Sequence, residues 1–365
     1  MGLKCGIVGL PNVGKSTLFN LLSNAKAQSA NFPFCTIEPN IGVTSVPDER
    51  LNALAKLVHP ERIVPATVDI VDIAGLVKGA SKGEGLGNKF LANIRETDAI
   101  LHVIRCFDDE NVVHVDGSIN PIRDKETIDF ELQLKDLESL EKKAERLKRA
   151  ASTGDKDAKK AVAVLDVYKK HMEKGMPART APVDEADKVI IEDAFLLTVK
   201  PVMYICNVDE KSVLTGNDYT RKVEEIAQRE GAEVLIIAGK LEAEITELED
   251  PEERAMFLED AGLNEPGMNK LIKSAYKLLN LSTYFTAGVK EVRAWTIENG
   301  MTAPQAAGVI HTDFQKGFIK AEVIKFSDYI SYGSEQAVKE AGKMSMEGKE
   351  YKVEDGDVMN FKFNV

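Results

Sequence analysis

The chain has 365 residues and a formal net charge of −12, and 44% of its residues are hydrophobic and 29% are charged. This length predicts two or three domains, and the composition is that of a soluble globular protein. No run of about 18 apolar residues is present, which excludes a membrane-spanning helix. The acidic balance argues against nonspecific nucleic-acid binding by the whole surface, but it leaves room for a local basic patch.

The cysteines indicate a reducing compartment. None of the four, Cys5, Cys35, Cys106 and Cys206, forms a CxxC or CxxH spacing. Cys5, Cys106 and Cys206 lie in apolar runs and are interpreted as reduced core thiols. Residues 3–9 run directly into a glycine-rich loop, so we interpret them as a first strand and not as a signal peptide. We therefore expect a cytoplasmic protein with no membrane partner.

Strands rich in Ile and Val alternate with helical patterns over residues 1–125 and again over residues 200–280. The expected strands are residues 3–9, 67–73, 100–106, 201–207 and 234–238, and the expected helices include residues 18–22, 51–58, 219–229 and 268–279. Alternation of this kind implies parallel strands with helices on both faces of the sheet. The two stretches together predict one α/β domain, interrupted by residues 126–199.

The interrupting stretch has helical spacing. Apolar residues recur in steps of three and four in two runs, which are Leu137, Leu140, Ala144, Leu147 and Ala151, then Ala161, Leu165, Tyr168 and Met172. Thr153-Gly154-Asp155 separates them. The pattern predicts an antiparallel helical hairpin with coiled-coil periodicity. Because the ends of such a hairpin lie close together, it can be inserted without breaking the α/β domain.

The last stretch, residues 281–365, has the pattern of a small α+β domain. Strands are expected at residues 284–287, 291–297, 318–326 and 358–363, with a short helix at residues 303–310. A module of this size can fold alone.

The strongest motif lies directly after the first strand. Residues 9–17, Gly-Leu-Pro-Asn-Val-Gly-Lys-Ser-Thr, match the pattern GxxxxGK[ST]. The glycines let backbone amides wrap around phosphates, Lys15 supplies a charge for the β- and γ-phosphates, and Ser16 supplies a hydroxyl to Mg²⁺. A strand before the loop and a helix after it favour this interpretation over a chance glycine-rich turn. The expected nucleotide-binding residues of this loop are Asn12, Val13, Gly14, Lys15, Ser16 and Thr17.

Two further segments are expected to contact the Mg²⁺ ion and the γ-phosphate in such a site. Asp72 ends a strand and Gly75 follows it, so Asp72 is expected to hold Mg²⁺ and Gly75 to offer its N–H to the γ-phosphate. Thr36 lies in the loop between the phosphate-binding helix and the Asp72 strand. A threonine there can complete the Mg²⁺ shell and switch with the γ-phosphate. The expected metal ligands are therefore Ser16, Thr36 and Asp72. Cys35 adjoins Thr36, and it is either a redox-sensitive thiol or an inert packed one.

The base-binding motif departs from that of GTPases. Many GTPases carry Asn-Lys-x-Asp at a strand end, where the Asp accepts two N–H groups that only guanine presents. This chain has Asn207-Val208-Asp209-Glu210, so Val208 replaces the Lys and Glu210 the Asp. A site that hydrogen-bonds the guanine edge in this way can favour guanine over another base by about 10⁴-fold or more. A site without these hydrogen bonds should lose that preference. The alternative is that Asn207 is an ordinary turn residue.

These motifs resemble those of the YchF, or Obg-like ATPase, family. The resemblance rests on GLPNVGKST, NFPFCTIEPN, DIAGL, the NxxE in place of NKxD, and the C-terminal stretch YFTAGVKEVRAWT…TAPQAAGVIHTDF…GDVMNFKFNV, and it covers essentially the whole chain. It implies a Ras-like core, an inserted hairpin and a C-terminal TGS domain of the ubiquitin-like β-grasp type. It also implies ATP preferred over GTP, Mg²⁺ as cofactor, and association with the ribosome through RNA and proteins of the large subunit. GTPases usually have a second loop that contacts the base and carries Ser-Ala-Lys. In this chain Ala238 and Gly239 lie in that loop and depart from the usual sequence, and they are expected to contact the nucleotide.

The residue that positions the attacking water is not settled by the motifs. Leu76 stands where many GTPases have a Gln, and an aliphatic side chain cannot orient water. His114, in a polar loop after the strand of residues 100–106, can accept or donate near neutral pH and is the candidate catalytic residue beside Lys15. The alternative is a surface histidine. By analogy with the family, Asn12 offers another route, because a P-loop Asn can help to bind K⁺ near the β–γ bridge.

The expected hairpin carries a basic tip. Between residues 141 and 160 there are eight basic residues against four acids; the basic residues are Lys142, Lys143, Arg146, Lys148, Arg149, Lys156, Lys159 and Lys160. They form either a solvated helix face or a contact with ribosomal RNA. Two functions from different classes follow: an ATP-hydrolysing switch that cycles on the ribosome, or a binding module whose nucleotide is structural. A GTPase is a third interpretation, favoured only if Glu210 binds guanine.

Overall fold

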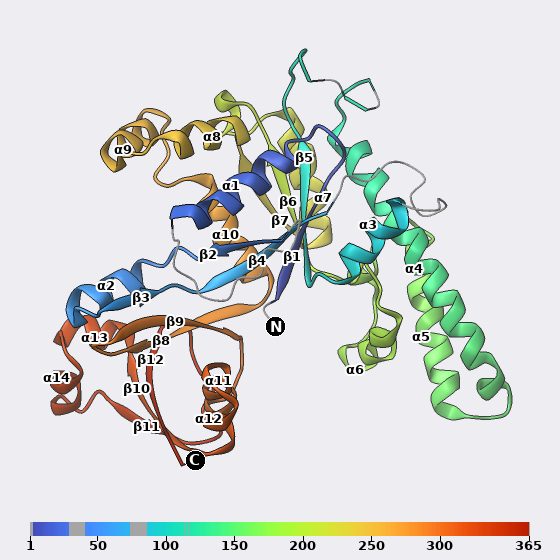
Figure 1. Ribbon diagram of the computed structural model, residues 1–365. Helices are drawn as coiled ribbons and strands as arrows, with labels where there is room; N and C mark the ends of the chain where they lie inside the picture. Colours follow the sequence, from blue (N-terminus) through green and yellow to red (C-terminus); the bar gives the residue numbers. More distant parts are fainter. Residues whose placement is uncertain (1–2, 29–40, 74–85, 113, 116, 365) are drawn as a thin grey trace. The chain divides into compact units, whose positions relative to one another are not determined.

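The computed structural model describes residues 3–28, 41–73, 86–112, 114–115 and 117–364 (Figure 1). The chain divides into two compact units. The first comprises residues 1–42 and 69–268, and the second comprises residues 43–68 and 269–365. None of the helices in the described ranges is both long and apolar enough to cross a bilayer.

The first unit is built on a six-stranded sheet in the order β2-β4-β1-β5-β6-β7. The strands are β1 (Lys4–Val8), β2 (Ile41–Ser45), β4 (Thr67–Asp72), β5 (Ala99–Arg105), β6 (Val202–Asn207) and β7 (Glu233–Ile237). From β1, inside the sheet, the chain continues to the edge strand β2 and then to β4. β5, β6 and β7 follow in that order on the other side of β1, and β1 pairs in parallel with both β4 and β5. The carboxyl ends of these parallel strands therefore gather at one edge of the sheet, where ligands of such folds bind.

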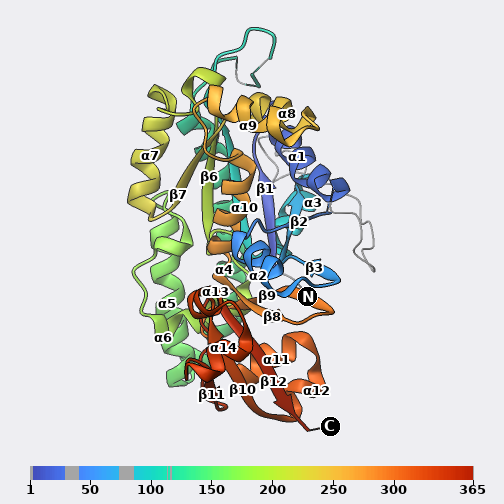
Figure 2. The ribbon, with the colours of Figure 1, turned by 90° about the vertical axis from the view of Figure 1, so that its left-hand side faces the viewer.

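Helices cover both faces of this sheet, which explains why its central strands are buried along their whole length (Figures 1 and 2). All residues of β5 and β6 are buried. The covering helices include α1 (Lys15–Gln28), α3 (Leu86–Arg95), α7 (Asp218–Glu230) and α8 (Gly239–Glu247). α7 begins at a capping box of Asn217 and Thr220 and ends at Gly231, whose φ is 66°. Local sequence thus sets both ends of this helix.

The inserted segment forms two helices that pack on each other. α4 (Pro121–Ser152) and α5 (Lys156–Met172) share a core that includes Leu140, Leu165, Tyr168 and Met172. Gly154, with a φ of 104°, turns the chain, and Asp155 caps α5 by accepting from the N–H groups of Asp157 and Ala158. The predicted helical periodicity is confirmed. Three short helices follow before β6: η1 (Ala178–Thr180), α6 (Glu185–Lys188) and η2 (Val189–Ala194).

The second unit contains another six-stranded sheet, in the order β11-β10-β12-β8-β9-β3. Its strands are β8 (Leu281–Ala287), β9 (Glu291–Glu298), β10 (Phe318–Lys325), β11 (Ser345–Glu347), β12 (Asp357–Phe363) and β3 (Arg62–Val64). β12 pairs antiparallel with β10 and parallel with β8. α11 (Ala303–Ile310) supplies Ala303, Ala306 and Ala307 to the core on one face of this sheet. The unit also holds α12 (Thr312–Lys316), α13 (Phe326–Tyr332) and α14 (Glu335–Glu340).

A segment from the N-terminal part of the chain completes this second unit. β3 pairs in parallel with β9, and α2 (Glu49–Val58) packs on β8, β9 and α13. Leu54 of α2 is fully buried. Residues 43–68 were expected within the α/β domain, since the helix of residues 51–58 continues its alternation, and sequence pattern does not show which sheet a helix covers. The three-domain division itself stays a prediction, while the contacts divide the chain at residues 42, 68 and 268.

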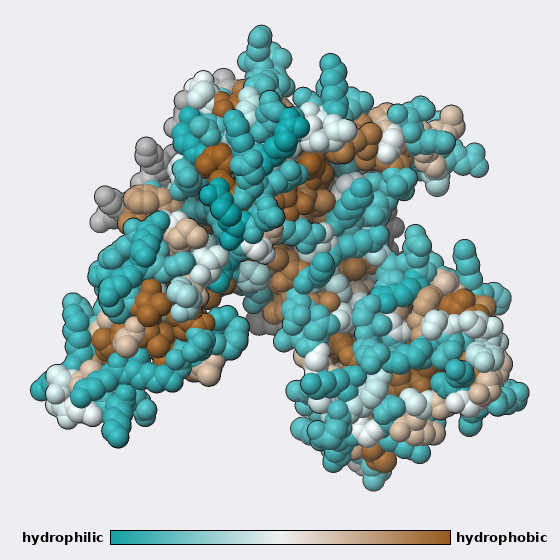
Figure 3. Space-filling view, turned by 180° about the vertical axis from the view of Figure 1, so that it is seen from behind, coloured by the Kyte–Doolittle hydropathy of each residue, from teal (hydrophilic) through white to brown (hydrophobic). Residues whose placement is uncertain are grey.

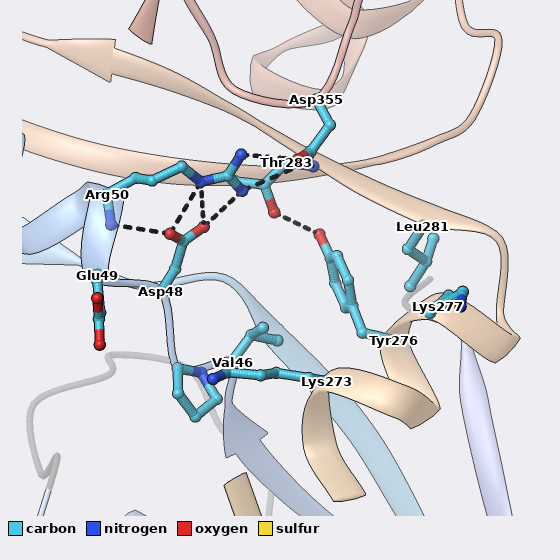
Figure 4. A pocket seen from close by; sticks show the side chains of 11 residues that line it. Val46, Asp48, Glu49, Arg50, Lys273, Tyr276, Lys277, Leu281, Thr283 and Asp355 are labelled. Carbon is cyan, nitrogen blue, oxygen red and sulfur yellow. Dashed lines mark hydrogen bonds and ion pairs between the residues drawn. The ribbon is translucent and has the colours of Figure 1, made fainter. Parts of the chain in front are cut away.

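An ion-pair cluster ties α2 to the C-terminal strands beside a pocket of about 480 Å³ (Figure 4). The Arg50 guanidinium donates to Asp48 and to Asp355, and Asp355 also accepts from the Thr283 N–H. Arg50 thus lies between carboxylates from two distant parts of the sequence.

The expected elements are present, with boundaries that differ by up to three residues except at the end of α1, which lies six residues later than expected. The helices of residues 18–22 and 51–58 extend to α1 and α2. The elements missed are all ten residues long or shorter, and they include β2, β3, β11, α3, α8, α9 (Pro251–Asp260) and α12–α14. α10 (Gly267–Leu278) begins within the first unit and continues into the second.

Candidate nucleotide site

The phosphate-binding loop connects β1 to α1. Asn12 and Gly14 have φ values of 63° and 95°, the left-handed conformations that let successive N–H groups turn inward. Gly9 has no room for a side chain, because an added Cβ would lie 2.8 Å from the Val103 carbonyl oxygen. Val13 is buried, whereas Ser16 and Thr17 are exposed at the start of α1. The loop therefore has the backbone form that its sequence predicts.

Lys15 and Asp72 meet at the centre of this site. The Lys15 Nζ donates to Asp72 Oδ1 at 2.9 Å. Asp72 ends β4 and is paired with Ile7 of β1, the strand that leads into the loop. The sheet therefore places the predicted phosphate-binding cation beside the predicted metal-binding carboxylate.

Asn207 joins the phosphate loop to the second base loop. Its side-chain Nδ2 donates to the Val13 carbonyl at 2.9 Å, and its Oδ1 accepts from the Gly239 N–H at 3.0 Å. The Asn207 side chain is buried. Gly239 begins α8, and the buried Ala238 precedes it. Asn207 thus does more than turn the chain: its amide holds two loops together, a contact that sequence spacing does not reveal.

Glu210 is exposed beside this junction. It begins the short helix η3 (Glu210–Ser212), and Asp209 caps that helix by accepting from the Ser212 N–H. Val208 is buried, and its N–H donates to the Ile237 carbonyl. Asp209 and Glu210 are both exposed, but the carboxylate of Asp209 is engaged by the backbone of η3.

His114 is buried, contrary to what a polar surface loop suggests. Its Nε2 lies 2.7 Å from Asp124 Oδ2, and 5% of the His114 side chain and 3% of the Asp124 side chain are exposed. Asp124 belongs to the first turn of α4. The structure therefore rules out the plain surface histidine, and the catalytic role of His114 stays a prediction.

Thr36, Gly75, Cys35 and Leu76 lie outside the described residues. The other cysteines are buried, as predicted. Burial raises the pKa of the Cys5 thiol to about 12, which keeps it protonated.

Sequence reasoning missed a buried arginine at the end of β5. Arg105 is 1% exposed and donates to the carbonyl oxygens of Phe107, Asp109 and Val112. An arginine that closes an apolar strand is the only sequence signal for this role. It fixes the first half of the loop that carries His114.

The donor set of the site suits Mg²⁺. The part of the chain that the structure describes has no group of three or more His, Cys, Asp or Glu side chains arranged to hold a metal. Mg²⁺ bound to nucleotide phosphates needs only one or two protein oxygens, and the Ser16 hydroxyl and Asp72 carboxylate are hard donors of that kind. These residues therefore fit the metal without a dedicated protein cage.

Two family models match the chain. One, YchF-GTPase_C, described as a protein of unknown function (DUF933), matches residues 281–364. The other, MMR_HSR1, described as a 50S ribosome-binding GTPase, matches residues 4–165. The chain is also similar over its full length to proteins named ribosome-binding ATPase YchF: it is 58% identical to that of Haemophilus ducreyi, 58% to that of Escherichia coli O157:H7 and 52% to that of Bacillus subtilis, with 100% of each chain covered.

A solved structure gives the same result for the fold. The Schizosaccharomyces pombe YchF GTPase is 39% identical and superposes with a TM-score of 0.89, over 99% of this chain and 98% of the other. The two chains therefore share a mixed α/β fold that contains a P-loop GTPase-like core. With full-length identities of this size, the chain belongs to the YchF family.

Proposed function

We propose that this protein is a ribosome-associated, Mg²⁺-dependent ATPase that binds and hydrolyses ATP in preference to GTP. It acts in the cytoplasm as a nucleotide-dependent switch in translation or stress regulation. The names of its relatives support the ATPase and ribosome-binding parts. The observation that carries the proposal is the assembled phosphate site, in which Lys15 lies beside Asp72 while Asn207 ties the loop to the base side.

The phosphate loop binds the triphosphate through its amides and the Lys15 charge. Because the helix dipole of α1 also points its positive end at this loop, anionic oxygens are stabilised there. A bound Mg²⁺ would neutralise charge on the β- and γ-phosphates, held by Ser16, Asp72 and Thr36. Asn12, exposed and left-handed in the loop, is the candidate contact for K⁺.

The base preference follows from Glu210. Adenine has an acceptor at ring N1 and no amine at C2, so a carboxylate that needs two donors gains nothing from it. Guanine gains from a correctly placed Asp. Glu210 is longer by one methylene than the Asp of GTPases, and we expect this length to move its carboxylate away from the position of a guanine-reading Asp. Without that hydrogen-bonded readout the site no longer favours guanine.

Ribosome association is proposed for the hairpin and the C-terminal unit. Three of the eight basic residues are neutralised by acids, since Lys142 pairs with Glu138, Lys143 with Asp193 and Lys160 with Asp187. The other five are exposed near the tip: Arg146, Lys148, Arg149, Lys156 and Lys159. Figure 3 shows the hairpin at its lower left as mostly hydrophilic, with an apolar band. Exposed cations of this kind suit the phosphates of large-subunit RNA.

The finer architecture belongs to the same proposal. We assign α4 and α5 as a coiled-coil domain and the C-terminal sheet as a TGS domain of the β-grasp type. The parallel pairing of β12 with β8 and the packing of α11 on one face support the β-grasp assignment.

Steady-state ATP hydrolysis with and without purified ribosomes tests the proposal. A switch should be stimulated by ribosomes, and the stimulation should fall as salt rises, because phosphate contacts are lost. Replacing the five exposed cations of the tip by Gln should remove the stimulation and leave the basal rate. The second candidate is a binding module with a structural nucleotide, which Leu76 favours. It predicts tight nucleotide retention and no ribosome response.

A further inference from the structure

Glu230 holds both ends of the inserted hairpin to the α/β core. Near the start of α4, the Lys125 Nζ donates to Glu230 Oε1 at 2.6 Å. In η1, which follows the hairpin, an Arg179 terminal nitrogen donates to Glu230 Oε2 at 2.8 Å. Glu230 is the last residue of α7, which packs on β6 and β7. The segment that enters the insertion and the segment that leaves it therefore bind one carboxylate of the core, each at its own oxygen.

A buried strand of the core sheet contacts the same carboxylate. The Tyr204 hydroxyl of β6 donates to Glu230 Oε2 at 2.6 Å. Tyr204 is fully buried, and 7% of the Glu230 side chain is exposed. Burial would raise the pKa of Glu230, but the charge of Lys125 and the hydrogen bonds from Lys125 and Tyr204 lower it below its usual value. A charged carboxylate thus lies at the centre of a largely buried group of four residues, which we call the Glu230 cluster: Lys125, Arg179, Tyr204 and Glu230.

The other end of α7 contacts the helix that begins at Glu210. Asn217 caps this end, and its Nδ2 donates to the Ser212 hydroxyl at 3.3 Å and to the Cys106 carbonyl at 2.8 Å. Ser212 is the last residue of η3. The Gly216 N–H also donates to the Ser212 carbonyl at 2.9 Å. α7 has 13 residues and is therefore about 20 Å long, so one helix connects η3 to the core end of the hairpin (Figure 2).

β6 makes a second connection between the Glu230 cluster and the nucleotide site. Tyr204 and Asn207 lie on this strand, three residues apart. Asn207 holds the phosphate loop to the Gly239 backbone. Every residue of β6 is buried, so a shift of the strand would disturb the packing around it. A change at the cluster therefore reaches the nucleotide site through both α7 and β6.

We propose that the Glu230 cluster couples the hairpin to the nucleotide site. The proposal rests on the proposed function, in which the ribosome contacts the exposed cations near the hairpin tip. A tilt of the hairpin moves Lys125 and Arg179, and through Glu230 it moves α7, whose other end holds η3. ATP and the ribosome are coupled when each favours one position of the hairpin over another. The coupling is reciprocal, so ribosomes should change the affinity for ATP by the same factor as ATP changes the affinity for ribosomes.

Glu230→Gln tests the cluster and leaves the proposed nucleotide and ribosome contacts unchanged. The glutamine has the size of the glutamate, but its amide nitrogen donates and cannot accept. Lys125 and Arg179 also only donate, and they face different oxygens of Glu230. Whichever way the amide turns, one of the two cations loses its acceptor on α7, and one end of the hairpin is released. Lys125→Met and Arg179→Met each release one end by themselves.

Glu141→Gln is the matched control. It makes the same replacement in an exposed ion pair, in which Lys169 of α5 donates to Glu141 of α4 at 2.8 Å. This pair joins the two helices of the hairpin to each other and not to the core. The variant should therefore retain native coupling.

The experiment measures the Kd for a non-hydrolysable ATP analogue with and without saturating ribosomes, and the Kd for purified ribosomes with and without the analogue. In the native protein the two Kd ratios should be equal, and each should differ from unity by about 5- to 150-fold. In Glu230→Gln both ratios should move to within about twofold of unity. The Kd of the free chain for the analogue should stay near native, because no proposed phosphate or base contact is changed.

Hydrogen exchange separates lost coupling from lost folding. In the native protein, exchange in η3 and in the first turn of α7 should change when ribosomes bind, because the hairpin acts on them through Glu230. In Glu230→Gln this response should be absent, while exchange in β5 without ribosomes stays near native. Slow exchange in β5 shows that the variant is folded.

The outcomes distinguish this inference from the proposed function. If the ATP analogue and ribosomes do not change each other's Kd in the native protein, the switch of the proposed function is wrong, and the inference falls with it. If native coupling is present and a folded Glu230→Gln retains it, the inference is overturned and the proposed function stands. If Glu230→Gln does not fold, native coupling in both Lys125→Met and Arg179→Met overturns the inference, and loss of coupling in either supports it. Loss of coupling in Glu141→Gln would show that the coupling does not depend on the cluster, which also overturns the inference.

Discussion

The Nζ atom of Lys15 donates to Oδ1 of Asp72 at 2.9 Å, a hydrogen bond between residues 57 positions apart in the sequence. The exposed fractions of the two side chains are 9% and 20%. The pairing of β1 with β4 fixes this contact before any ligand arrives, since Ile7 and Asp72 are register partners. The phosphate and metal sides of the site are therefore built by the same two strands.

Replacing Lys15 and replacing Ser16 should each weaken nucleotide binding, but for different reasons. Lys15→Met keeps the apolar stem and removes the charge, so it should weaken triphosphate binding with and without Mg²⁺. Ser16→Ala should remove only the Mg²⁺-dependent part of the affinity. Calorimetric titration at several Mg²⁺ concentrations measures both, with Ser23→Ala in the same helix as the control. Unchanged Mg²⁺ dependence in Ser16→Ala would contradict the assignment.

Shortening the acidic side chain of the base loop should move the base preference. Glu210→Asp keeps the charge and restores the side chain that GTPases use, so GTP affinity should rise relative to ATP affinity. Placing a lysine at position 208 as well would force a charge into the space of Val208, which is 3% exposed, and would cost stability. The single variant is therefore the cleaner test. No change in the ATP-to-GTP affinity ratio would show that Glu210 does not face the base.

His102 should make the protein less stable in mild acid. Burial lowers the pKa of His102 to about 4, and its charged surroundings shift that pKa in both directions; they are Lys125, Asp129, Arg179 and Glu230. Between about pH 6.5 and pH 4 the unfolded chain binds a proton at this residue that the folded chain does not. The free energy of unfolding should therefore fall by about 2 kcal/mol from about pH 7 to about pH 5 on account of this residue.

Urea unfolding at those two pH values measures the effect. His102→Gln does not titrate there, so its loss of stability between the two pH values should be smaller than the native loss. Equal losses in the two proteins would mean that His102 titrates alike in the folded and unfolded chains.

Truncating a residue of α2 should destabilise the C-terminal sheet. Leu54 is fully buried, and α2 packs on β8 and β9, more than 200 residues later in the chain. Leu54→Ala should cost about 2–5 kcal/mol. Hydrogen exchange should accelerate in β8 and β9 and stay near native in β5, which belongs to the first unit. The exposed Leu57 of the same helix gives the control, Leu57→Ala. Faster exchange confined to β5 would contradict the assignment of residues 43–68 to the second unit.

Local patterns predicted most of the elements because their causes are local. The phosphate loop follows from Gly14 and from the strand before it, and the hairpin follows from apolar spacing around Leu140 and Leu165. The division into units did not follow, because it depends on the pairing of β3 with β9 and the packing of α2 on β8 and β9, which local patterns do not encode. A helix with one apolar face has the same sequence pattern whichever sheet it covers.

In the candidate site, too, the sequence predicted the residues but not the contacts between them. Lys15, Ser16 and Asp72 were found from motif spacing, and Asn207 from its place at a strand end. Their mutual contacts depend on strand order, which spacing does not encode. Asp124 carries no motif at all, and its contact with His114 appears only when the loop and the first turn of α4 are folded together.

The preference for ATP over GTP is the central claim, and equilibrium affinities of the purified chain for the two nucleotides test it most directly. Titration of each nucleotide under identical Mg²⁺ and salt conditions gives the ratio without assumptions about turnover. Because Glu210 stands where GTPases have the guanine-reading Asp, and the phosphate site is complete, we predict a lower Kd for ATP than for GTP. A Kd for GTP about tenfold below that for ATP, a difference of about 1.4 kcal/mol, would contradict the account.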